Sequence, residues 1–138
     1  MNMDELIDLL HQGGYSCVIG KEGETRTFHQ RGVADLWALC QSEEKLLHGA
    51  QIADKVVGKG AAALMIYGGV KEVYAEVIST SALALLQEHR VPTTYRTETD
   101  CIINRQGDGV CPVETLCNQL YSIGDMYNEI GKFINRKA

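Results

Sequence analysis

Residues 55–67 form the stretch that most constrains what this chain can fold into. From Val56 to Ile66, small or apolar side chains fall on nearly every face of a helix. A helix that is apolar all round has to be buried between other layers of structure. Apolar runs at 46–53 and 70–78 flank it and predict strands. A strand, a buried helix and a second strand predict an α/β fold with right-handed crossovers and at least partly parallel strands.

The other predicted elements follow from apolar spacing, caps and turn residues. A glycine-bearing turn at 20–23 predicts a hairpin, which adds antiparallel strands and makes the central sheet mixed. We expect helices on both faces of this sheet and a single domain over residues 1–138, because no linker-like segment interrupts the chain. The predicted helices are 3–11, 32–42, one capped by Ser79 or Thr80, 112–122 and 125–135, the last capped by Asp125. The further predicted strands are 15–19, 24–29, 93–97 and 100–105.

Composition and charge exclude several classes of protein. The hydrophobic fraction is 45% and the net charge is −5. The negative charge argues against a nucleic-acid partner, which needs a basic surface. The sequence begins without a basic, apolar leader and has no run of about 18 apolar residues, so we expect no membrane association. The cysteines are odd in number and fit no disulfide framework, which indicates reduced thiols in a cytoplasmic protein.

Three separated motifs carry a resemblance to a known family. They occur in order over about residues 46–117, and the predicted hairpin precedes them. The chain resembles the cytidine deaminase superfamily, and is most similar to its branch known as domain-of-unknown-function family 1893. The resemblance implies a three-layer cytidine-deaminase-like fold. The motifs are Gly49-Ala50 with Asp54-Lys55-Val56-Val57-Gly58-Lys59, then Gly69-Val70-Lys71-Glu72-Val73-Tyr74-Ala75-Glu76, and Cys111-Pro112-Val113-Glu114.

The ligands that a zinc deaminase needs are missing from the matching positions. Such enzymes place His-x-Glu or Cys-x-Glu at one helix start and Pro-Cys-x-x-Cys at the next. Here the corresponding segments begin at Asp54 and Ser79, and neither supplies a thiolate or imidazole. Cys111 and Cys117 are six residues apart, which is not the spacing of a zinc site. We therefore expect no metal, no other cofactor and no zinc-dependent deamination.

The segment from Asp54 to Gly60 is a candidate phosphate site. A helix that begins near residue 55 would present free N–H groups and a partial positive charge. Lys55 and Lys59, four residues apart, would lie near one helical face, while Gly58 would allow a ligand to approach the backbone. Asp54 would then face ribose hydroxyls. The alternative is structural: Asp54 caps a helix, the glycines permit close packing and the lysines are solvated.

Cys111 and Glu114 mark a second candidate site. Pro112 and Glu114 are typical of a helix start, whereas cysteine is a poor cap. A thiol at a helix N-terminus can have a lowered pKa and become nucleophilic, although a nearby Glu114 would oppose this. Both the structural interpretation and the reactive one stay open.

Polar residues that follow the strand at 70–78 complete the candidate set. Ser79 and Ser81 suit a helix cap better than a nucleophile, because no histidine adjoins them in sequence. Glu76 lies late on the strand, where ligands bind in open α/β sheets, and could orient a ligand hydroxyl or remain a solvated charge.

Three functions are compatible with these patterns. The first is a metal-free domain that binds a small nucleotide-like ligand, of the adenine nucleotide or ADP-ribose type, through Asp54, Lys55, Gly58, Lys59, Glu76, Ser79, Ser81 and Glu114. The second is an enzyme that uses Asp54 or Cys111 as a nucleophile on such a ligand. The third is a regulatory or structural subunit without catalysis. The resemblance also makes a homo-oligomer an expectation, by analogy alone.

Overall fold

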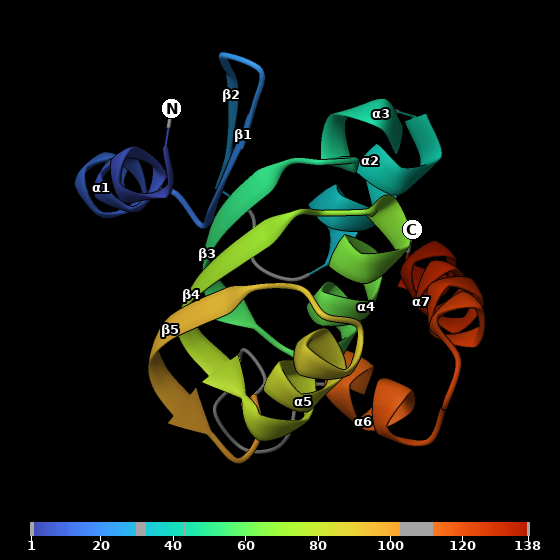
Figure 1. Cartoon of the computed structure of the whole chain (residues 1–138). Coiled ribbons are helices and arrows are strands. Elements are labelled where there is room, and N and C mark those ends of the chain that lie inside the picture. The colour runs from blue at the N-terminus through green and yellow to red at the C-terminus, as the bar shows by residue number, and fades with distance from the viewer. Residues whose placement is uncertain (1, 30–32, 43, 103–111, 138) are drawn as a thin grey trace.

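The computed structural model describes residues 2–29, 33–42, 44–102 and 112–137. Its sheet has five strands in the order β2-β1-β3-β4-β5 (Figure 1). Strand β1 is antiparallel to both β2 and β3, whereas β3, β4 and β5 are parallel. The predicted mixed sheet is therefore confirmed. The strands are β1 (Cys17–Lys21), β2 (Glu24–Phe28), β3 (Gln51–Val57), β4 (Glu72–Ser79) and β5 (Thr93–Thr99).

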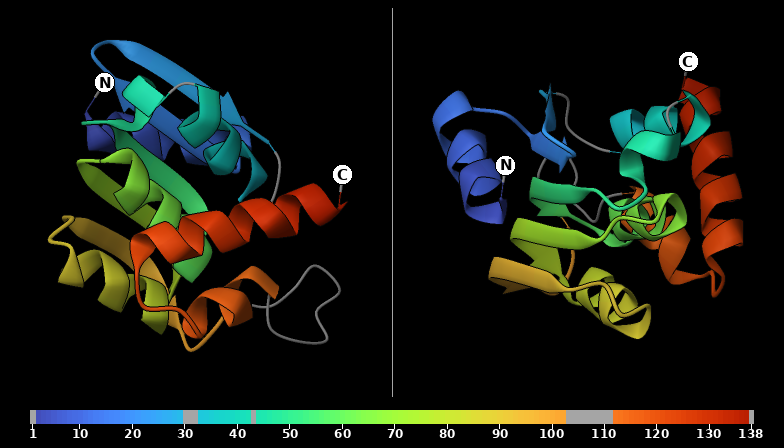
Figure 2. Two further views of the ribbon diagram at one scale, coloured as in Figure 1. Left: turned by 90° about the vertical axis from the view of Figure 1, so that its right-hand side faces the viewer. Right: turned by 45° about the horizontal axis from the view of Figure 1, so that its top comes forward.

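Helices cover both faces of the sheet, as predicted. Among the described helices, only α1 lies on one face, and the others gather on the opposite face (Figures 1 and 2). None of the described helices is both long and apolar enough to cross a membrane. The helices are α1 (Met3–Gly13), α2 (Ala34–Ser42), α3 (Glu44–Leu47), α4 (Lys59–Gly68), α5 (Thr80–Glu88), α6 (Pro112–Asn118) and α7 (Ile123–Lys137).

Helix α4 is the centre of the larger core. Its residues from Gly60 to Met65 are all buried, which confirms the burial predicted from its apolar sequence. It packs against α2, α5, α6 and α7 on the side of the sheet opposite α1. A smaller core joins α1 to the other face through Leu6, Leu10, Val18 and Ala53.

The hairpin of β1 and β2 follows from its turn residues. Lys21 pairs with Glu24, so the turn has two central residues, Glu22 and Gly23. Both have positive φ angles, 50° and 83°. This conformation matches the twist of a hairpin and favours glycine at the second position.

The largest difference from the predicted elements lies before α4. The helix begins at Lys59 rather than near residue 55, and β3 extends through Val57. Val56 and Val57 are β-branched and continue the strand. Gly58, with φ −94° and ψ 178°, is the extended N-cap residue. Asp54 and Lys55 are consequently strand residues, not the start of a helix.

Other boundaries differ more locally. The predicted strand at 46–53 is replaced by α3 and the first part of β3. The serine cap of α5 is confirmed at Ser79, but Asp125 does not cap α7. That helix begins at Ile123, and the Ser122 hydroxyl accepts a hydrogen bond from the Asp125 N–H at 3.0 Å. Residues 100–102 do not form the start of the predicted strand at 100–105, and the rest of that segment lies outside the described residues.

Candidate functional site

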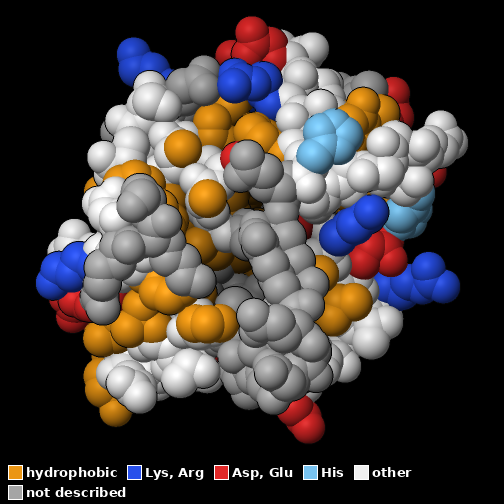
Figure 3. All heavy atoms as spheres, turned by 180° about the vertical axis from the view of Figure 1, so that it is seen from behind, with side chains coloured by type: hydrophobic (Ala, Val, Ile, Leu, Met, Phe, Trp, Pro, Cys, Tyr) orange, Lys and Arg blue, Asp and Glu red, His pale blue; other side chains and the backbone are white. Residues whose placement is uncertain are grey.

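Two helices begin side by side at the carboxyl end of the parallel strands. Strand β3 leads through Gly58 into α4, and β4 leads through Ser79 into α5. In open α/β sheets, this end of the strands is where ligands bind. Helix α6 contacts α4 and contributes Glu114 to this region. On the side opposite to that of Figure 1, hydrophobic side chains gather near the middle of the molecular surface (Figure 3).

Glu114 connects the starts of both helices. Its side chain is only 1% exposed. The Lys59 backbone N–H donates to Glu114 Oε2 at 2.7 Å, and the Ser81 hydroxyl donates to Glu114 Oε1 at 3.2 Å. A carboxyl group so deeply buried needs such partners, because an uncompensated buried charge is strongly destabilising. The start of α4 also supplies a favourable partial positive charge.

Gly58 leaves the space that the Glu114 carboxyl group occupies in this contact. A Cβ atom at residue 58 would lie 2.4 Å from Glu114 Oε2, closer than atoms can approach. Because the φ angle of Gly58 is negative, the need for glycine arises from the lack of space rather than from backbone strain. Gly58 was expected from the sequence to let a ligand approach the backbone, but the Glu114 side chain occupies that place.

The serines extend the hydrogen-bonded cluster to α5. The Ser79 hydroxyl caps the helix by accepting from the Ala82 N–H at 3.1 Å. It lies 3.4 Å from the Ser81 hydroxyl, which also contacts Glu114. We call Gly58, Lys59, Ser79, Ser81 and Glu114 the helix-start cluster. These five residues were each selected from the sequence as ligand-binding candidates, and the structure brings them together.

Asp54 lies earlier on β3, opposite Cys17 of β1. It is 9% exposed, and burial raises its pKa to about 7. Hydrogen bonds from the Val56 N–H, the Lys55 N–H and the Cys17 thiol lower the pKa of Asp54. The pKa of the Cys17 thiol is raised well above its usual value, first by burial and then by the nearby Asp54 carboxylate. Asp54 is therefore a buried carboxyl group that can exchange a proton near neutral pH, with a neutral thiol beside it.

The prediction that Lys55 and Lys59 lie near one helical face is wrong. Lys55 is an exposed strand residue and Lys59 is the first residue of α4, so they do not share a helical face. The Lys59 N–H, which stands at the observed start of α4, is bonded to Glu114. Of the two lysines, Lys59 belongs to the helix-start cluster and Lys55 does not.

Glu76 belongs to a different group of residues, on the face of the sheet covered by α1. It accepts a hydrogen bond from the Tyr74 hydroxyl at 2.6 Å and contacts His11 of α1. Its pKa is lowered, chiefly by the Tyr74 hydrogen bond, while burial raises the pKa of Tyr74 to about 12. Glu76 also lies 3.8 Å from Arg96 of β5. His11 showed no usable pattern in the sequence, because its partner is 65 residues away.

The structure does not test whether the Cys111 thiol is reactive. Cys111 lies outside the described residues, and Cys117 is buried in α6. Within the described ranges, no three His, Cys, Asp or Glu side chains gather as a metal ion would require. The absence of a tightly bound zinc stays a prediction for metal analysis of the purified protein.

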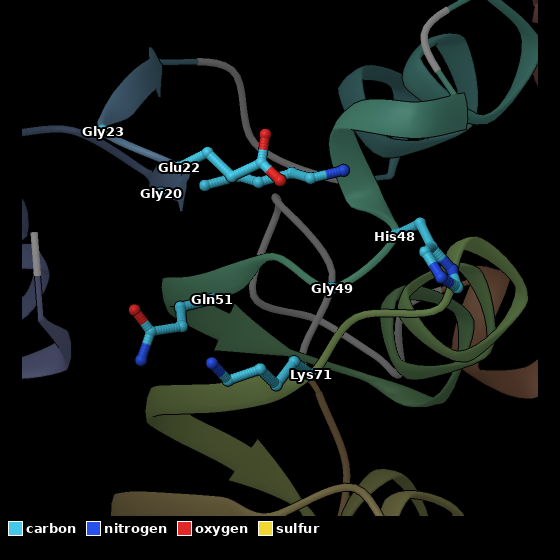
Figure 4. A pocket seen from close by; sticks show the side chains of 8 residues that line it. Gly20, Glu22, Gly23, His48, Gly49, Gln51 and Lys71 are labelled. Atoms are coloured by element: carbon cyan, nitrogen blue, oxygen red, sulfur yellow. The ribbon is translucent and has the colours of Figure 1, made fainter.

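A cavity that the sequence analysis missed opens at the other end of the sheet. It has a volume of about 430 Å³. Lys71 and the Gln51 amide lie on one side of it and Glu22 lies across it (Figure 4). The hairpin turn forms part of the wall of this cavity. From the sequence, only that turn was identified among the lining segments, and it was interpreted as a structural element. Its lining residues are Gly20, Lys21, Glu22, Gly23, His48, Gly49, Gln51 and Lys71.

A family model and a solved structure both relate this chain to the same family. The family model described as "TM1506: Domain of unknown function (DUF1893)" matches residues 5–134. The fold is similar to the crystal structure of a DUF1893 family protein (TM1506) from Thermotoga maritima, with a TM-score of 0.87 and 20% sequence identity. The similarity covers 94% of this chain and 88% of that one. A sequence comparison with curated proteins found no match.

Proposed function

Because the chain belongs to the DUF1893 family, whose description states no function, we propose from its own polar residues that it binds a nucleotide-like small molecule. The ligand is of the adenine nucleotide or ADP-ribose type and binds at the carboxyl end of the sheet. The observation that carries the proposal is the helix-start cluster, in which Glu114 and Ser79 are buried where α/β sheets bind ligands. The resemblance to the cytidine deaminase superfamily supports this choice of ligand, because the pockets of that superfamily take a base and a ribose.

The chemistry of the cluster suggests which part of the ligand meets which residue. Glu114 and Ser81 present hydrogen-bond acceptors, which suit ribose hydroxyls or the amino group of a base. Lys59 is half-buried at the start of α4 and carries a positive charge, which suits a phosphate. Since Glu114 already accepts from the Lys59 N–H, we place the phosphate against the lysine side chain and the sugar toward Glu114.

Thermal denaturation with adenosine, AMP and ADP-ribose tests this proposal. A ligand at 100 times its dissociation constant should stabilise the fold by about 2.7 kcal/mol. Lys59→Ala should reduce the shift given by the two phosphate compounds and leave that of adenosine unchanged. Glu114→Gln should reduce all three. Lys55→Ala is the matched control, because this exposed strand lysine lies outside the cluster and should leave every shift intact.

The proposal fails if none of the three compounds shifts the melting curve of the wild-type protein. It also fails if Lys55→Ala weakens the response as much as Lys59→Ala does. In the first case, the helix-start cluster serves only to hold α4, α5 and α6 together, and a structural or regulatory role becomes the better interpretation.

A second candidate function, catalysis, depends on Asp54. A buried carboxyl group with a pKa of about 7 is suited to accept or donate a proton at neutral pH. With Cys111 outside the described residues, Asp54 is the candidate whose surroundings can be described. Mass spectrometry of AMP or ADP-ribose after incubation would detect turnover. Asp54→Asn should abolish turnover if Asp54 is catalytic and should change only affinity if it is a binding residue.

A further inference from the structure

Among the described residues, no strand pairs with the outer edge of β5. This strand is the last in the sheet order, and its residues from Thr94 to Glu98 are all exposed. Tyr95 is 42% exposed, so its ring adds apolar surface to this strand. Free edges are normally protected by proline, lysine or a bulge, because they can pair with another strand. The seven residues of β5 include no proline and no lysine, and their charged side chains are Arg96 and Glu98.

The backbone of β5 presents alternate residues to this edge. The Val73 N–H donates to the Pro92 carbonyl at 3.0 Å, and β4 and β5 are parallel. In a parallel ladder, this pattern directs the backbone groups of even-numbered residues toward β4. The N–H and C=O groups of Tyr95 and Thr97 consequently point away from β4, where an added strand could bond to them.

We propose that two copies of the chain associate through β5, antiparallel about a two-fold axis at Thr97. In this register, the two Thr97 residues bond to each other through their backbones. Arg96 of each copy then lies opposite Glu98 of the other, as a non-hydrogen-bonded pair whose side chains are close. The same ladder places two opposite-charge pairs on one face of a sheet that is continuous across both copies.

Neighbouring registers are less favourable. An axis at Arg96 would place the two arginines opposite each other, and an axis at Glu98 would do the same with two carboxylates, which is destabilising. An axis at Tyr95 would place Arg96 opposite Thr94 and leave both charges without partners across the interface. The charge pattern of β5 therefore selects Thr97 as the centre.

The contacts that Arg96 and Glu98 already make do not use all of their hydrogen-bonding atoms. The Thr80 hydroxyl donates to Glu98 Oε2 at 2.9 Å, so Oε1 can accept from an arginine of the other copy. Arg96 is 75% exposed and approaches Glu76 through one nitrogen at 3.8 Å. Its other N–H groups remain available, since a guanidinium group has five.

Analytical ultracentrifugation over a concentration series tests the association, with charge variants as the probe. R96E alone and E98R alone each place like charges opposite one another at both positions. Each should weaken self-association about tenfold or more. A mixture of R96E with E98R should associate again, because carboxylate then faces guanidinium twice. The double variant R96E/E98R should behave like the wild type.

Thr97→Pro provides a second, independent variant. It removes a backbone donor on the free edge and leaves the ladder with β4 intact, so the protein should fold but no longer associate. Circular dichroism confirms that each variant is folded. A wild-type protein that stays monomeric at about 100 μM, where a micromolar dimer would form, overturns the proposal. So does association that neither the single charge variants nor Thr97→Pro weakens.

Discussion

Polar residues are buried at the carboxyl end of the sheet and exposed at its amino end. At the carboxyl end, Glu114 and Ser79 are buried, and each hydrogen-bonds to the start of a helix. At the amino end, Lys71 and Glu22 are exposed around an open cavity. A buried polar group must be matched by partners, whereas an exposed one is matched by water. We therefore expect residues at the carboxyl end to be far more sensitive to substitution than residues of the same types at the amino end.

Gly58→Ala should have the largest effect. The added methyl group would displace Glu114 from its bond to the Lys59 N–H, and we expect a loss of about 3 kcal/mol in the free energy of unfolding. Urea denaturation measures this loss. In a Glu114→Ala background, the same substitution should cost much less, because the side chain that it displaces is gone.

Gly124→Ala is the control for this prediction. A Cβ atom at residue 124 of α7 would have no neighbour within 4 Å. We expect this substitution to be neutral or stabilising by up to about 1 kcal/mol. An equal loss for Gly58→Ala with and without Glu114 would show that Glu114 is not what makes glycine necessary.

The second prediction concerns pH. The pKa of Asp54 is about 7 in the folded protein, against about 3.9 in an unfolded chain. Between these values the folded state binds more protons, so the stability contributed by protonated Asp54 is lost as pH rises toward 7. From pH 5 to pH 8, the loss should be roughly 2–3 kcal/mol. Asp54→Asn should remove this dependence.

Denaturant titrations of the wild type and Asp54→Asn at both pH values measure the difference between their pH dependences. Asp35→Asn is the comparison variant, since Asp35 lies in α2, is only partly buried and has a pKa raised by burial alone. The prediction is contradicted if the wild type and Asp54→Asn lose the same stability between pH 5 and pH 8.

Ser79→Ala should have a smaller effect, about 1.5 kcal/mol, because it removes a buried helix cap. Ser122→Ala removes the cap of α7, where the bond to the Asp125 N–H is exposed and water can replace it. We expect a loss of about 0.5 kcal/mol there. Thermal or urea denaturation of both variants compares them directly, and a larger loss for Ser122→Ala would refute the role assigned to burial.

Lys71→Ala should change the free energy of unfolding by less than about 0.5 kcal/mol, because Lys71 is exposed at the amino-end cavity. The same denaturation experiment applies. A loss above about 1 kcal/mol would mean that the amino end is also held together by its polar side chains, and the contrast between the two ends would not stand.

Structural features could be predicted from the sequence where their signal lies within a few neighbouring residues. Ser79 or Thr80 was predicted as a cap because these residues follow a strand and precede an apolar helix, and Ser79 is the cap. The hairpin followed from the glycine-bearing turn at 20–23, which the structure narrows to Glu22 and Gly23. The start of α4 was misplaced, because Val56 and Val57 suit a buried strand as well as a buried helix, and short apolar runs do not distinguish the two.

Contacts between distant parts of the chain could not be predicted. Lys59 and Glu114 were both selected as candidates, but nothing in the sequence shows that they bond to each other. That contact depends on how α6 packs across the start of α4. The amino-end cavity was missed for the same reason, since the hairpin, His48 and Lys71 come from separate segments that only the folded sheet brings together.

The bond between Lys59 and Glu114 spans 55 residues, which has a consequence during translation. At about 5–20 residues per second, the ribosome adds Glu114 roughly 3 to 11 s after Lys59. During that interval α4 and β4 are synthesised after β3, without the carboxyl group that completes the start of α4. The apolar surface of α4 that later packs against α6 and α7 also stays uncovered until they emerge. The C-terminal helices therefore close the core of a chain whose sheet was made first.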